Sequence, residues 1–526
     1  MHTLINVIEL AAQGNDRLST LALQTQELYL STEYRLIWVN HGRPTIQATE
    51  AFTILNNAAD KGLDPRDYNG NSDAFSFLST QLPIDSSESA LIRFDLALSL
   101  ATMRFVSDIH AGRANPRPRP FVVTIGEKTV DLASFVLELA AAPSVEPLVE
   151  SIEPHYNGYT RTLAALQRYR TFSQRDQGAP LPDVAKSIRP GMTYSGLARL
   201  RALLLLLGDL SDLPEPTSTT YDEELSAAVR QFQERHGLEG TGFLDTPTIH
   251  ELNVPLPERI LQLELTLERW RWLPDTFRRP PIVVNIPEFR LHVIDAQHRI
   301  VNSMNIVVGR AYHHPTPVFE GAIKSVLFRP PWNVPLEIQR QELLPEIEKN
   351  PAYLSENSFD IVDASGNPVE TFPPTAETLN KLRSGHLFLR QRPGDENSLG
   401  LVKFEFPNPY DIYMHGTPAQ ELFSRTRRDF SHGCVRVEDP VALAVWLLRD
   451  TPGWDRERIE SAMHANHSER VSLETPTPVW IVYGTAVVLE DGRVRFFKDL
   501  YGEDADLQQE LAKIRSLDSA PTTSLP

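Results

Sequence analysis

The chain has 526 residues, one of them cysteine, with 41% hydrophobic and 23% charged residues and a formal net charge of −18. A single cysteine excludes an internal disulfide framework and any zinc or iron–sulfur site built from several cysteines. The acidic balance argues against nucleic acid as a partner, because nucleic-acid binding requires a basic surface. At about 150 residues per domain, this length predicts three or four domains.

Residues 1–185 are predicted to be mostly helical. Leu91, Phe94, Leu98, Ala101 and Phe105 recur every three or four residues, which places them on one face of a helix. We interpret residues 1–185 as a helical, scaffold-like region.

The first residues lack a basic segment followed by an apolar stretch and a small-residue cleavage site. Taken literally, the chain begins without a signal peptide, and it could equally be a mature or truncated form from which a signal was removed. The sequence contains no run of about eighteen apolar residues, so no transmembrane helix is predicted.

Residues 186–255 have the pattern of a small three-helix domain. An apolar helix is predicted over residues 197–207, and a second helix ends at His236 and Gly237, where glycine suits the C-terminal cap. A glycine-containing turn then leads to a third helix over residues 246–252. This pattern resembles the small peptidoglycan-binding module, and the alternative is a small helical domain without that function.

The remaining sequence changes from helical to strand patterns. Residues 256–279 are predicted to form a charged connector helix, and residues 280–501 to form a β-rich domain. Residues 502–526 are mostly polar and are expected to form a frayed tail. Within the β-rich domain, short β-branched segments predict strands at residues 281–286, 290–294, 302–309, 479–483, 487–489 and 494–497, with a hairpin turn at residues 490–493.

The cysteine lies in the segment Ser431-His432-Gly433-Cys434-Val435-Arg436. A thiolate nucleophile requires a lowered pKa and a nearby base, and histidine is the natural base. His432 is two residues from Cys434, and His415 is far enough away in the sequence to approach from a neighbouring strand. Arg436 would favour a thiolate or an anionic substrate. From spacing alone, a buried and inert cysteine is an equally good interpretation.

His415, fifteen intervening residues and then residues 431–434 resemble the signature of the YkuD-type L,D-transpeptidase catalytic domain. Further segments within residues 308–317, 328–335 and 391–404 resemble the same domain. Together with the helical region and the peptidoglycan-binding-like module, they resemble the large multidomain YcbB-like members. The resemblance implies a multidomain fold, in which an α-helical amino-terminal region and a three-helix module precede a β-rich catalytic domain with an inserted cap.

The resemblance implies roles for three residues at the centre of the site. Cys434 matches the nucleophile that forms a thioester with the donor stem peptide, and His415 matches the general base. Some relatives carry a serine after the base histidine, whereas this chain has Gly416. The Gly416 carbonyl is therefore expected to orient His415 through its other ring nitrogen.

The resemblance also implies an oxyanion hole and substrate contacts around the nucleophile. The backbone N–H groups of Gly433 and Cys434 are expected to stabilise the tetrahedral intermediate. His432 is expected to lie near the acyl group, and Ser431 and Arg436 to line the site. Tyr413 is expected to contact the substrate.

Two further segments are interpreted as parts of the site. The insertion at residues 335–400 is longer than a hairpin requires, and in multidomain relatives such a region forms a mobile cap over the donor site. The alternative is a solvated structural insertion. Arg425, Arg427 and Arg428 lie between base and nucleophile in the sequence, a position that favours attraction of stem-peptide carboxylates over the alternative of a solvated face.

These observations predict a peptidoglycan L,D-transpeptidase that forms 3→3 cross-links through a thioester on Cys434, with no metal or organic cofactor. Alternatives are an L,D-carboxypeptidase or use of another acceptor by the same acyl-enzyme, and a non-catalytic wall-binding scaffold. The expected partners are donor and acceptor stem peptides, with proteins of cell-wall synthesis as further candidates. The expected location is the periplasm or cell envelope, and carbapenems are expected to acylate Cys434.

Overall fold

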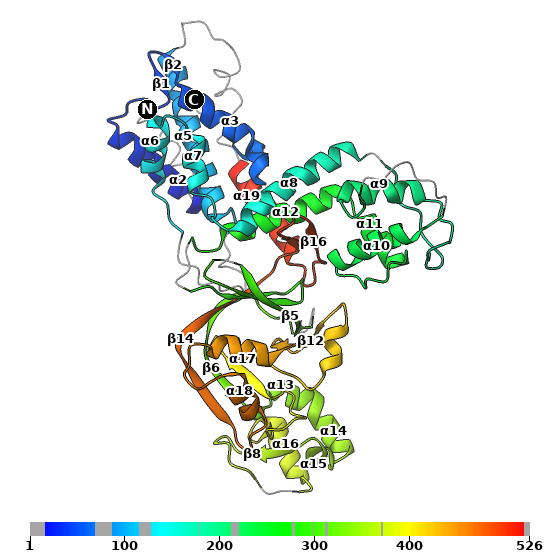
Figure 1. Cartoon of the computed structure of the whole chain (residues 1–526). Coiled ribbons are helices and arrows are strands. Elements are labelled where there is room, and N and C mark those ends of the chain that lie inside the picture. Colours follow the sequence, from blue (N-terminus) through cyan, green and yellow to red (C-terminus); the bar gives the residue numbers. More distant parts are fainter. Residues whose placement is uncertain are drawn as a thin grey trace. The chain divides into compact units, whose positions relative to one another are not determined.

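The computed structural model of the chain describes residues 16–68, 87–114, 128–176, 178–211, 220–275, 279–297, 299–310, 314–369 and 372–519 (Figure 1). The chain divides into two compact units. Unit 1 consists of Met1–Arg119, Thr124–Thr276 and Gly484–Pro526, and unit 2 consists of Pro120–Val123 and Phe277–Tyr483. Unit 1 contains the helical region and the three-helix module, and unit 2 is β-rich, so the expected multidomain architecture is confirmed.

The amino-terminal region of unit 1 is helical. Ser87 begins α5, because its hydroxyl accepts a hydrogen bond from the Ala90 N–H in the manner of an N-cap residue. Phe94, Leu98 and Phe105 of this helix are buried in a shared core, so the apolar periodicity of the sequence marks the packed face. The elements of this region are α2 (Asp16–Ser31), β1 (Val39–Asn40), β2 (Arg43–Pro44), α3 (Ile46–Asn56), η1 (Ala58–Lys61), η2 (Pro65–Asp67), α5 (Glu88–Ala111), α6 (Leu132–Ala141), α7 (Glu146–Ser151) and α8 (Asn157–Arg175).

The three helices predicted within residues 186–255 are confirmed. Gly208 and Gly237 follow the first two helices with φ angles of +80° and +65°, a left-handed conformation that glycine adopts without steric cost. Asp222 and Asp245 are N-caps, since each carboxylate accepts a hydrogen bond of 2.9 Å from the backbone N–H three residues on. The helices are α9 (Leu197–Leu207), α10 (Glu223–Arg235) and α11 (Thr246–Leu252).

The predicted connector at residues 256–279 is instead a core helix of unit 1, α12 (Leu256–Arg271). Glu268 is fully buried and accepts a hydrogen bond of 2.8 Å from the Ala114 N–H. The guanidinium of Arg271, also fully buried, lies 5.8 Å from the centroid of the Tyr159 ring. The charged residues that suggested a connector thus have partners inside the unit, which is why the prediction was wrong.

Residues 484–501, predicted to belong to the β-rich domain, belong to unit 1. β15 (Ala486–Val488) and β16 (Val494–Phe496) do form the predicted antiparallel hairpin. However, Arg235 of α10 donates a hydrogen bond to the Val494 carbonyl, and the ring of Phe496 packs 5.3 Å from that of Tyr169. The sequence identified the strands but carried no information on which core would bury them.

The tail predicted at residues 502–526 is a packed helix over α19 (Glu503–Ser519), and residues 520–526 lie outside the described residues. Leu507 is fully buried against α12, with Leu511 and Ile514 packed beside it. Arg515 donates a hydrogen bond of 2.7 Å to Asp67. The segment is polar on average, but its few apolar residues have helical spacing and form a narrow stripe on one face of the helix.

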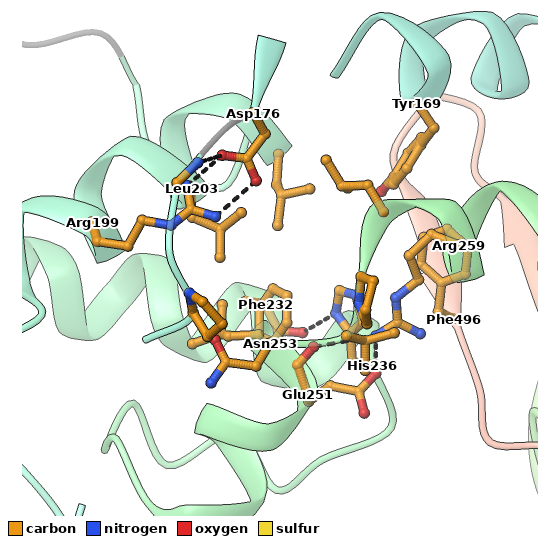
Figure 2. Close-up of a pocket in the computed structure, with 17 residues that line it drawn as sticks. Tyr169, Asp176, Arg199, Leu203, Phe232, His236, Glu251, Asn253, Arg259 and Phe496 are labelled. Atoms are coloured by element: carbon orange, nitrogen blue, oxygen red, sulfur yellow. Dashed lines mark hydrogen bonds and ion pairs between the residues drawn. The ribbon is translucent and has the colours of Figure 1, made fainter. Parts of the chain in front are cut away.

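A cavity of about 190 Å³ in unit 1 is lined by His236, which is buried (Figure 2). The His236 ring centroid lies 3.8 Å from that of Phe232 and 5.8 Å from that of Phe496. Burial lowers the pKa of His236, and the nearby cations of Arg259 and Arg235 lower that pKa further. His236 therefore stays neutral in the folded protein at a pH where an exposed histidine is charged.

Unit 2 is built on a nine-stranded sheet in the order β12-β5-β13-β11-β10-β6-β14-β3-β4, and β4 also pairs with β5, so the sheet closes into a barrel-like form. β6 and β14 run side by side as a long antiparallel pair (Figure 1), and helix α17 packs against β14. The elements are β3 (Ile282–Asn285), β4 (Arg290–Ile294), β5 (Ile300–Gly309), β6 (Phe319–Phe328), β10 (Val402–Glu405), β11 (Met414–His415), η4 (Gln420–Ser424), β12 (Asp429–Ser431), β13 (Val435–Val437), α17 (Pro440–Leu448), α18 (Arg456–Met463) and β14 (Glu469–Val482).

The insertion predicted at residues 335–400 is a folded subdomain, which we call the cap. Its apolar side chains form their own core, including Ile338, Ile347, Leu382 and Leu389. Its elements are β7 (Trp332–Asn333), α13 (Leu336–Ile338), the π-helical turn η3 (Gln339–Leu343), α14 (Leu344–Lys349), α15 (Tyr353–Glu356), β8 (Phe359–Val362), α16 (Ala376–Ser384) and β9 (Phe388–Gln391). In the described ranges, no helix combines the length and the apolar character needed to cross a bilayer.

The burial of His236 predicts a pH dependence of stability. Between pH 7.5 and 5.5 the unfolded chain gains a proton at this histidine and the folded chain does not, so acidification should reduce the free energy of unfolding by about 1 kcal/mol through this residue. Urea denaturation at both pH values should show a smaller loss in the variant His236→Gln. The matched control is His250→Gln, in an exposed position of the same module, and it should keep the pH dependence of the original chain. An unchanged pH dependence in His236→Gln would contradict the prediction.

Candidate active site

The pairing of β10, β11 and β13 places the predicted site residues on one face of the sheet. Lys403 of β10 pairs with His415 of β11, and His415 pairs in turn with Arg436 of β13. Successive side chains on a strand alternate between faces, so Met414 and Val435 point the other way and are fully buried. Lys403, Tyr413, His415, Cys434 and Arg436 all line one cavity of about 1270 Å³.

The segment around Cys434 is a tight turn between β12 and β13. Gly433 has a φ of +107°, a conformation that a side chain would strain. Ser431 accepts a hydrogen bond of 3.2 Å from the Gly433 N–H and donates one of 2.6 Å to the Cys434 carbonyl. This turn breaks the strand between His432 and Cys434, so the two side chains do not share a strand face.

A buried threonine that the sequence did not single out supports the same turn. Thr316 donates a hydrogen bond of 2.7 Å to the Gly433 carbonyl and accepts one of 2.8 Å from the Gly309 N–H. Gly309 permits this approach, because an added Cβ would lie 2.0 Å from the His314 carbonyl oxygen. Thr316 stands between two prolines, and that exceptional setting is the one sequence signal for its role.

Cys434 is half-buried, and its sulfur donates to the Asp411 carbonyl oxygen at 3.8 Å. Burial raises the pKa of the Cys434 thiol above its ordinary value of 9.0, while hydrogen bonds from Tyr413 and the positive charges of Lys403 and Arg436 act in the opposite direction. The resting nucleophile is therefore the neutral thiol. A thiol in this state requires a base at the moment of attack.

His415 is buried, and its Nδ1 lies 2.5 Å from the Gly416 carbonyl oxygen, so the predicted hydrogen bond is present. With Nδ1–H donating to a carbonyl, Nε2 is left with the lone pair that accepts a proton. Burial lowers the pKa of His415 to about 3, and the cations of Arg436 and Lys403 on either side add to that decrease. The imidazole is thus neutral at rest.

A second glycine lets the His415 strand approach its neighbour closely. Gly400 has a φ of +63°, and an added Cβ would lie 2.7 Å from the Gly416 carbonyl carbon. Asn397 is buried and shapes the turn that leads to Gly400, accepting a hydrogen bond of 2.8 Å from the Leu399 N–H. The position of the Gly416 carbonyl, and with it the orientation of His415, depends on this turn.

Of the two backbone N–H groups predicted to bind the oxyanion, one already donates a hydrogen bond within the turn. The Gly433 N–H is engaged by Ser431 at 3.2 Å, so its predicted role does not fit this arrangement. Within the described ranges, the Cys434 N–H has no hydrogen-bond acceptor and remains a donor for an oxyanion. Sequence spacing cannot reveal this difference, because it depends on which N–H groups the turn itself uses.

His432 contacts the cap. Its Nε2 lies 2.5 Å from Glu342 Oε1, and Glu342 belongs to the π-helical turn η3. The His432 ring also lies 5.3 Å from that of His314. His432, predicted to lie near the acyl group, thus joins the turn at Cys434 to the cap. The sequence did not indicate this contact, because His432 and Glu342 are far apart in the chain.

Two other predicted contributors are placed as follows. Arg436 lines the cavity, and burial lowers the pKa of its guanidinium, while the neighbouring Cys434 raises it. Tyr413, predicted to contact substrate, lies beside Cys434, and its ring faces the Lys403 ammonium at 3.9 Å. Lys403 was not identified from the sequence, although a lysine between two buried residues of a strand, Val402 and Phe404, was a usable signal.

Two arginines of the basic run between His415 and Cys434 make structural contacts, and neither Arg427 nor Arg428 lines the cavity. Arg428 is buried and donates to the backbone carbonyls of Ile306 and Phe289 at 3.2 and 3.1 Å. Arg427 forms two hydrogen bonds with Asp429 at 2.6 and 2.8 Å. Within the described residues, no cluster of three or more histidine, cysteine or carboxylate side chains is suited to hold a metal ion.

Comparison with known families identifies three parts of the chain. Residues 279–481 match the family described as "L,D-transpeptidase catalytic domain" (YkuD). The matched segment includes Cys434 and His415 and nearly coincides with unit 2. Residues 194–252 match the family described as "Putative peptidoglycan binding domain", and residues 23–166 match the family described as "Scaffold domain".

A Haemophilus influenzae protein named "Putative L,D-transpeptidase" is 32% identical to this chain over 275 residues, which are 51% of this chain and 54% of that protein. The chain therefore spans about half the length of this curated relative. A crystallised L,D-transpeptidase domain from Xylanimonas cellulosilytica aligns with 57% of this chain and 100% of its own chain, at 16% identity and a TM-score of 0.18, a similarity too low to support an argument.

The electrostatics of the site predict how Cys434 reacts with iodoacetamide. Because the thiolate is the reactive form and burial raises the pKa of the thiol, the alkylation rate should rise with pH up to and beyond 9.0. No step should occur near pH 6.5, since His415 stays neutral there. Intact mass after timed reaction measures the rate at this single cysteine. A fast, constant rate across neutral pH would indicate a thiolate–imidazolium pair and contradict this account.

Proposed function

We propose, for a chain that contains an L,D-transpeptidase catalytic domain and a peptidoglycan-binding domain, that this protein is a peptidoglycan L,D-transpeptidase forming 3→3 cross-links. The observation that supports the proposal most strongly is the shared face of β11 and β13. Cys434 lies there with a neutral His415, whose Nδ1 lies 2.5 Å from the Gly416 carbonyl oxygen.

In the first step, Cys434 Sγ attacks the carbonyl between the L-centre of diaminopimelate and the terminal D-alanine of a tetrapeptide stem. His415 Nε2 takes the thiol proton as the C–S bond forms, and the Cys434 N–H stabilises the oxyanion. The C–N bond to D-alanine then breaks, and the protonated His415 returns the proton to the leaving amine. The product is a thioester on Cys434 and free D-alanine.

In the second step, the side-chain amine of another stem attacks the thioester. An amide bond forms, the C–S bond breaks, and the proton of the amine returns to sulfur through His415. A cavity of about 1270 Å³ is larger than the usual 300–1000 Å³ of a small-ligand site, which favours a second stem over water as the acceptor. Hydrolysis, giving an L,D-carboxypeptidase, and transfer to other amines would use the same thioester.

The surroundings of the nucleophile suit an anionic peptide. The half-buried cations Lys403 and Arg436 lie in the cavity, where a carboxylate-bearing stem is attracted to them despite the net charge of −18 of the whole chain. The cap contributes Trp332 and Glu342 to the cavity wall, and we propose that it moves to admit the donor.

Several wider assignments are part of the same proposal. We propose that the protein is located in the periplasm or cell envelope, where peptidoglycan is found. In an oxidising compartment a second thiol could form a disulfide with the nucleophile, and this chain has only one cysteine. We also propose that it belongs to the YcbB-like subgroup, contributes to cell shape and meets other proteins of cell-wall synthesis.

Incubation of the purified protein with tetrapeptide muropeptides should give cross-linked dimers and free D-alanine, detected by mass spectrometry. Cys434→Ala and His415→Ala should reduce product by at least about a thousandfold, because nucleophile and base act in the same step. His464→Ala, at an exposed position outside the cavity, should leave the yield unchanged. Loss of D-alanine without dimer formation would indicate a carboxypeptidase, and no turnover would exclude both activities.

A carbapenem should acylate Cys434 and raise the intact mass of the protein by the mass of the whole drug. Opening of the β-lactam ring by the thiol adds every atom of the drug, since no group leaves in that step. The variant Cys434→Ala should show no adduct. A folded wild-type chain that forms no adduct would favour the non-catalytic scaffold.

A further inference from the structure

Lys403 occupies an exceptional place in the cavity of unit 2. In β10 (Val402–Glu405), Val402 and Phe404 are fully buried on one face, while Lys403 and Glu405 lie on the face that borders the cavity. Lys403 pairs directly with His415, so its side chain stands on the same side of the sheet as the base and the nucleophile. A half-buried ammonium in this position is costly unless it has a partner.

The partner of Lys403 is an aromatic ring. Its Nζ lies 3.9 Å from the centroid of the Tyr413 ring, well within the distance at which a cation is attracted to an aromatic face. Tyr413 lies two residues before His415 and is level with Cys434 in the register of β11 and β13. Hydrogen bonding from Tyr413 lowers the pKa of the Cys434 thiol. The Lys403 ammonium therefore contacts the Tyr413 ring, and Tyr413 in turn contacts the Cys434 sulfur.

Within the described residues, no carboxylate forms a close ion pair with this ammonium, although Glu405 and Asp411 stabilise its charge from a greater distance. Glu405, the neighbour on the same strand face, is held instead by Arg470 at 2.8 and 3.1 Å and by Ser325 at 2.7 Å. The positive charge of Lys403 thus stands near a sulfur that becomes negative when it loses its proton. The electrostatic attraction acts on the thiolate and is absent from the thiol.

We propose that Lys403 is a positioning residue of this site, which holds Tyr413 against Cys434 through its ammonium–ring contact and stabilises the thiolate form of the nucleophile. This inference deepens the proposed transpeptidase function and rests on it. Lys403 acts on the reaction through Tyr413 and through its charge, and it forms no bond to substrate in either step.

Other charged and titratable groups also face this part of the cavity and set the background against which Lys403 acts. Arg436 reinforces the effect of Lys403, the carboxylate of Asp411 opposes it, and neutral His415 leaves it unchanged. Glu405, which is ion-paired with Arg470, raises the pKa of Lys403, whereas Arg470 lowers it. The groups from neighbouring elements are His415 of β11, Tyr413 directly before β11, Asp411 of the preceding loop, Arg436 of β13, Glu405 of β10, Arg470 of β14, and the Glu342–His432 pair.

The test is the pH profile of iodoacetamide alkylation, read by intact mass in the full chain, because every adduct on a thiol belongs to Cys434. Lys403→Met keeps the length of the side chain and removes the charge. Its profile should shift upward by about one pH unit, which is a roughly tenfold slower alkylation at pH 8. Lys403→Arg retains a cation that can stack on the ring and should restore the rate to within about twofold. Lys381→Met, at an exposed position of α16, should leave the profile unchanged.

Tyr413→Phe provides the second variant, since it keeps the ring and removes the hydroxyl. If Lys403 acts largely by positioning Tyr413, adding Lys403→Met to Tyr413→Phe should slow alkylation much less than Lys403→Met does alone. A Lys403→Met profile equal to that of the original chain, or a Lys403→Arg variant as slow as Lys403→Met, would overturn the proposal. Fully additive effects in the double variant would contradict the positioning of Tyr413 by Lys403. Circular dichroism of every variant checks folding, and Lys403→Gln replaces Lys403→Met if that variant does not fold.

The alkylation readout needs no peptidoglycan. A chain that shows the predicted profiles and yields no D-alanine from muropeptides would contradict the proposed function while leaving the role of Lys403 in place. A chain that cross-links muropeptides but shows no Lys403 dependence of alkylation would do the reverse.

Discussion

The pairing register of β10, β11 and β13 is the constraint on which the site depends. Because opposed residues of paired strands share a face, this register aligns Lys403, His415 and Arg436 in one row and sets Cys434 level with Tyr413. A shift by one residue in any of the three strands would turn the base or the nucleophile into the barrel interior, where Met414 and Val435 now pack. The glycines at 400 and 433 and the hydroxyls of Ser431 and Thr316 hold the connecting turns in the conformation that this register requires.

Lys403 and Arg436, the two cations on either side of His415, disfavour a preformed thiolate–imidazolium ion pair in this site. Burial disfavours both the thiolate and the imidazolium, and the two flanking cations disfavour the imidazolium still more while favouring the thiolate. The resting site therefore holds a neutral thiol and a neutral imidazole, and in the proposed reaction the proton moves only as the bond to sulfur forms. Such a site protects its single thiol from oxidation and unproductive reaction, since thiolate character governs both.

Much of the helical architecture followed from sequence periodicity and capping residues. The helices of the three-helix module were predicted because an apolar face and a capping glycine such as Gly237 are local properties of the chain. The destinations of α12, the β15–β16 hairpin and α19 were predicted wrongly. Their charged or polar residues have partners in unit 1, such as Glu268 with the Ala114 N–H and Arg515 with Asp67, and these partners are distant in sequence.

The sequence by itself determined the identity of the reagents: the single cysteine, the histidine nineteen positions before it, and a glycine that offers a carbonyl to that histidine. These followed from the resemblance of a short linear motif to a known family, since residue types and spacing alone left an inert cysteine equally good. Only the tertiary structure decided which groups surround them. Lys403, Thr316 and Glu342 reach the site from a neighbouring strand, a loop and the cap. The physical reason is that pKa, hydrogen-bond availability and desolvation depend on neighbours in space, and strand pairing brings together residues that the sequence keeps far apart.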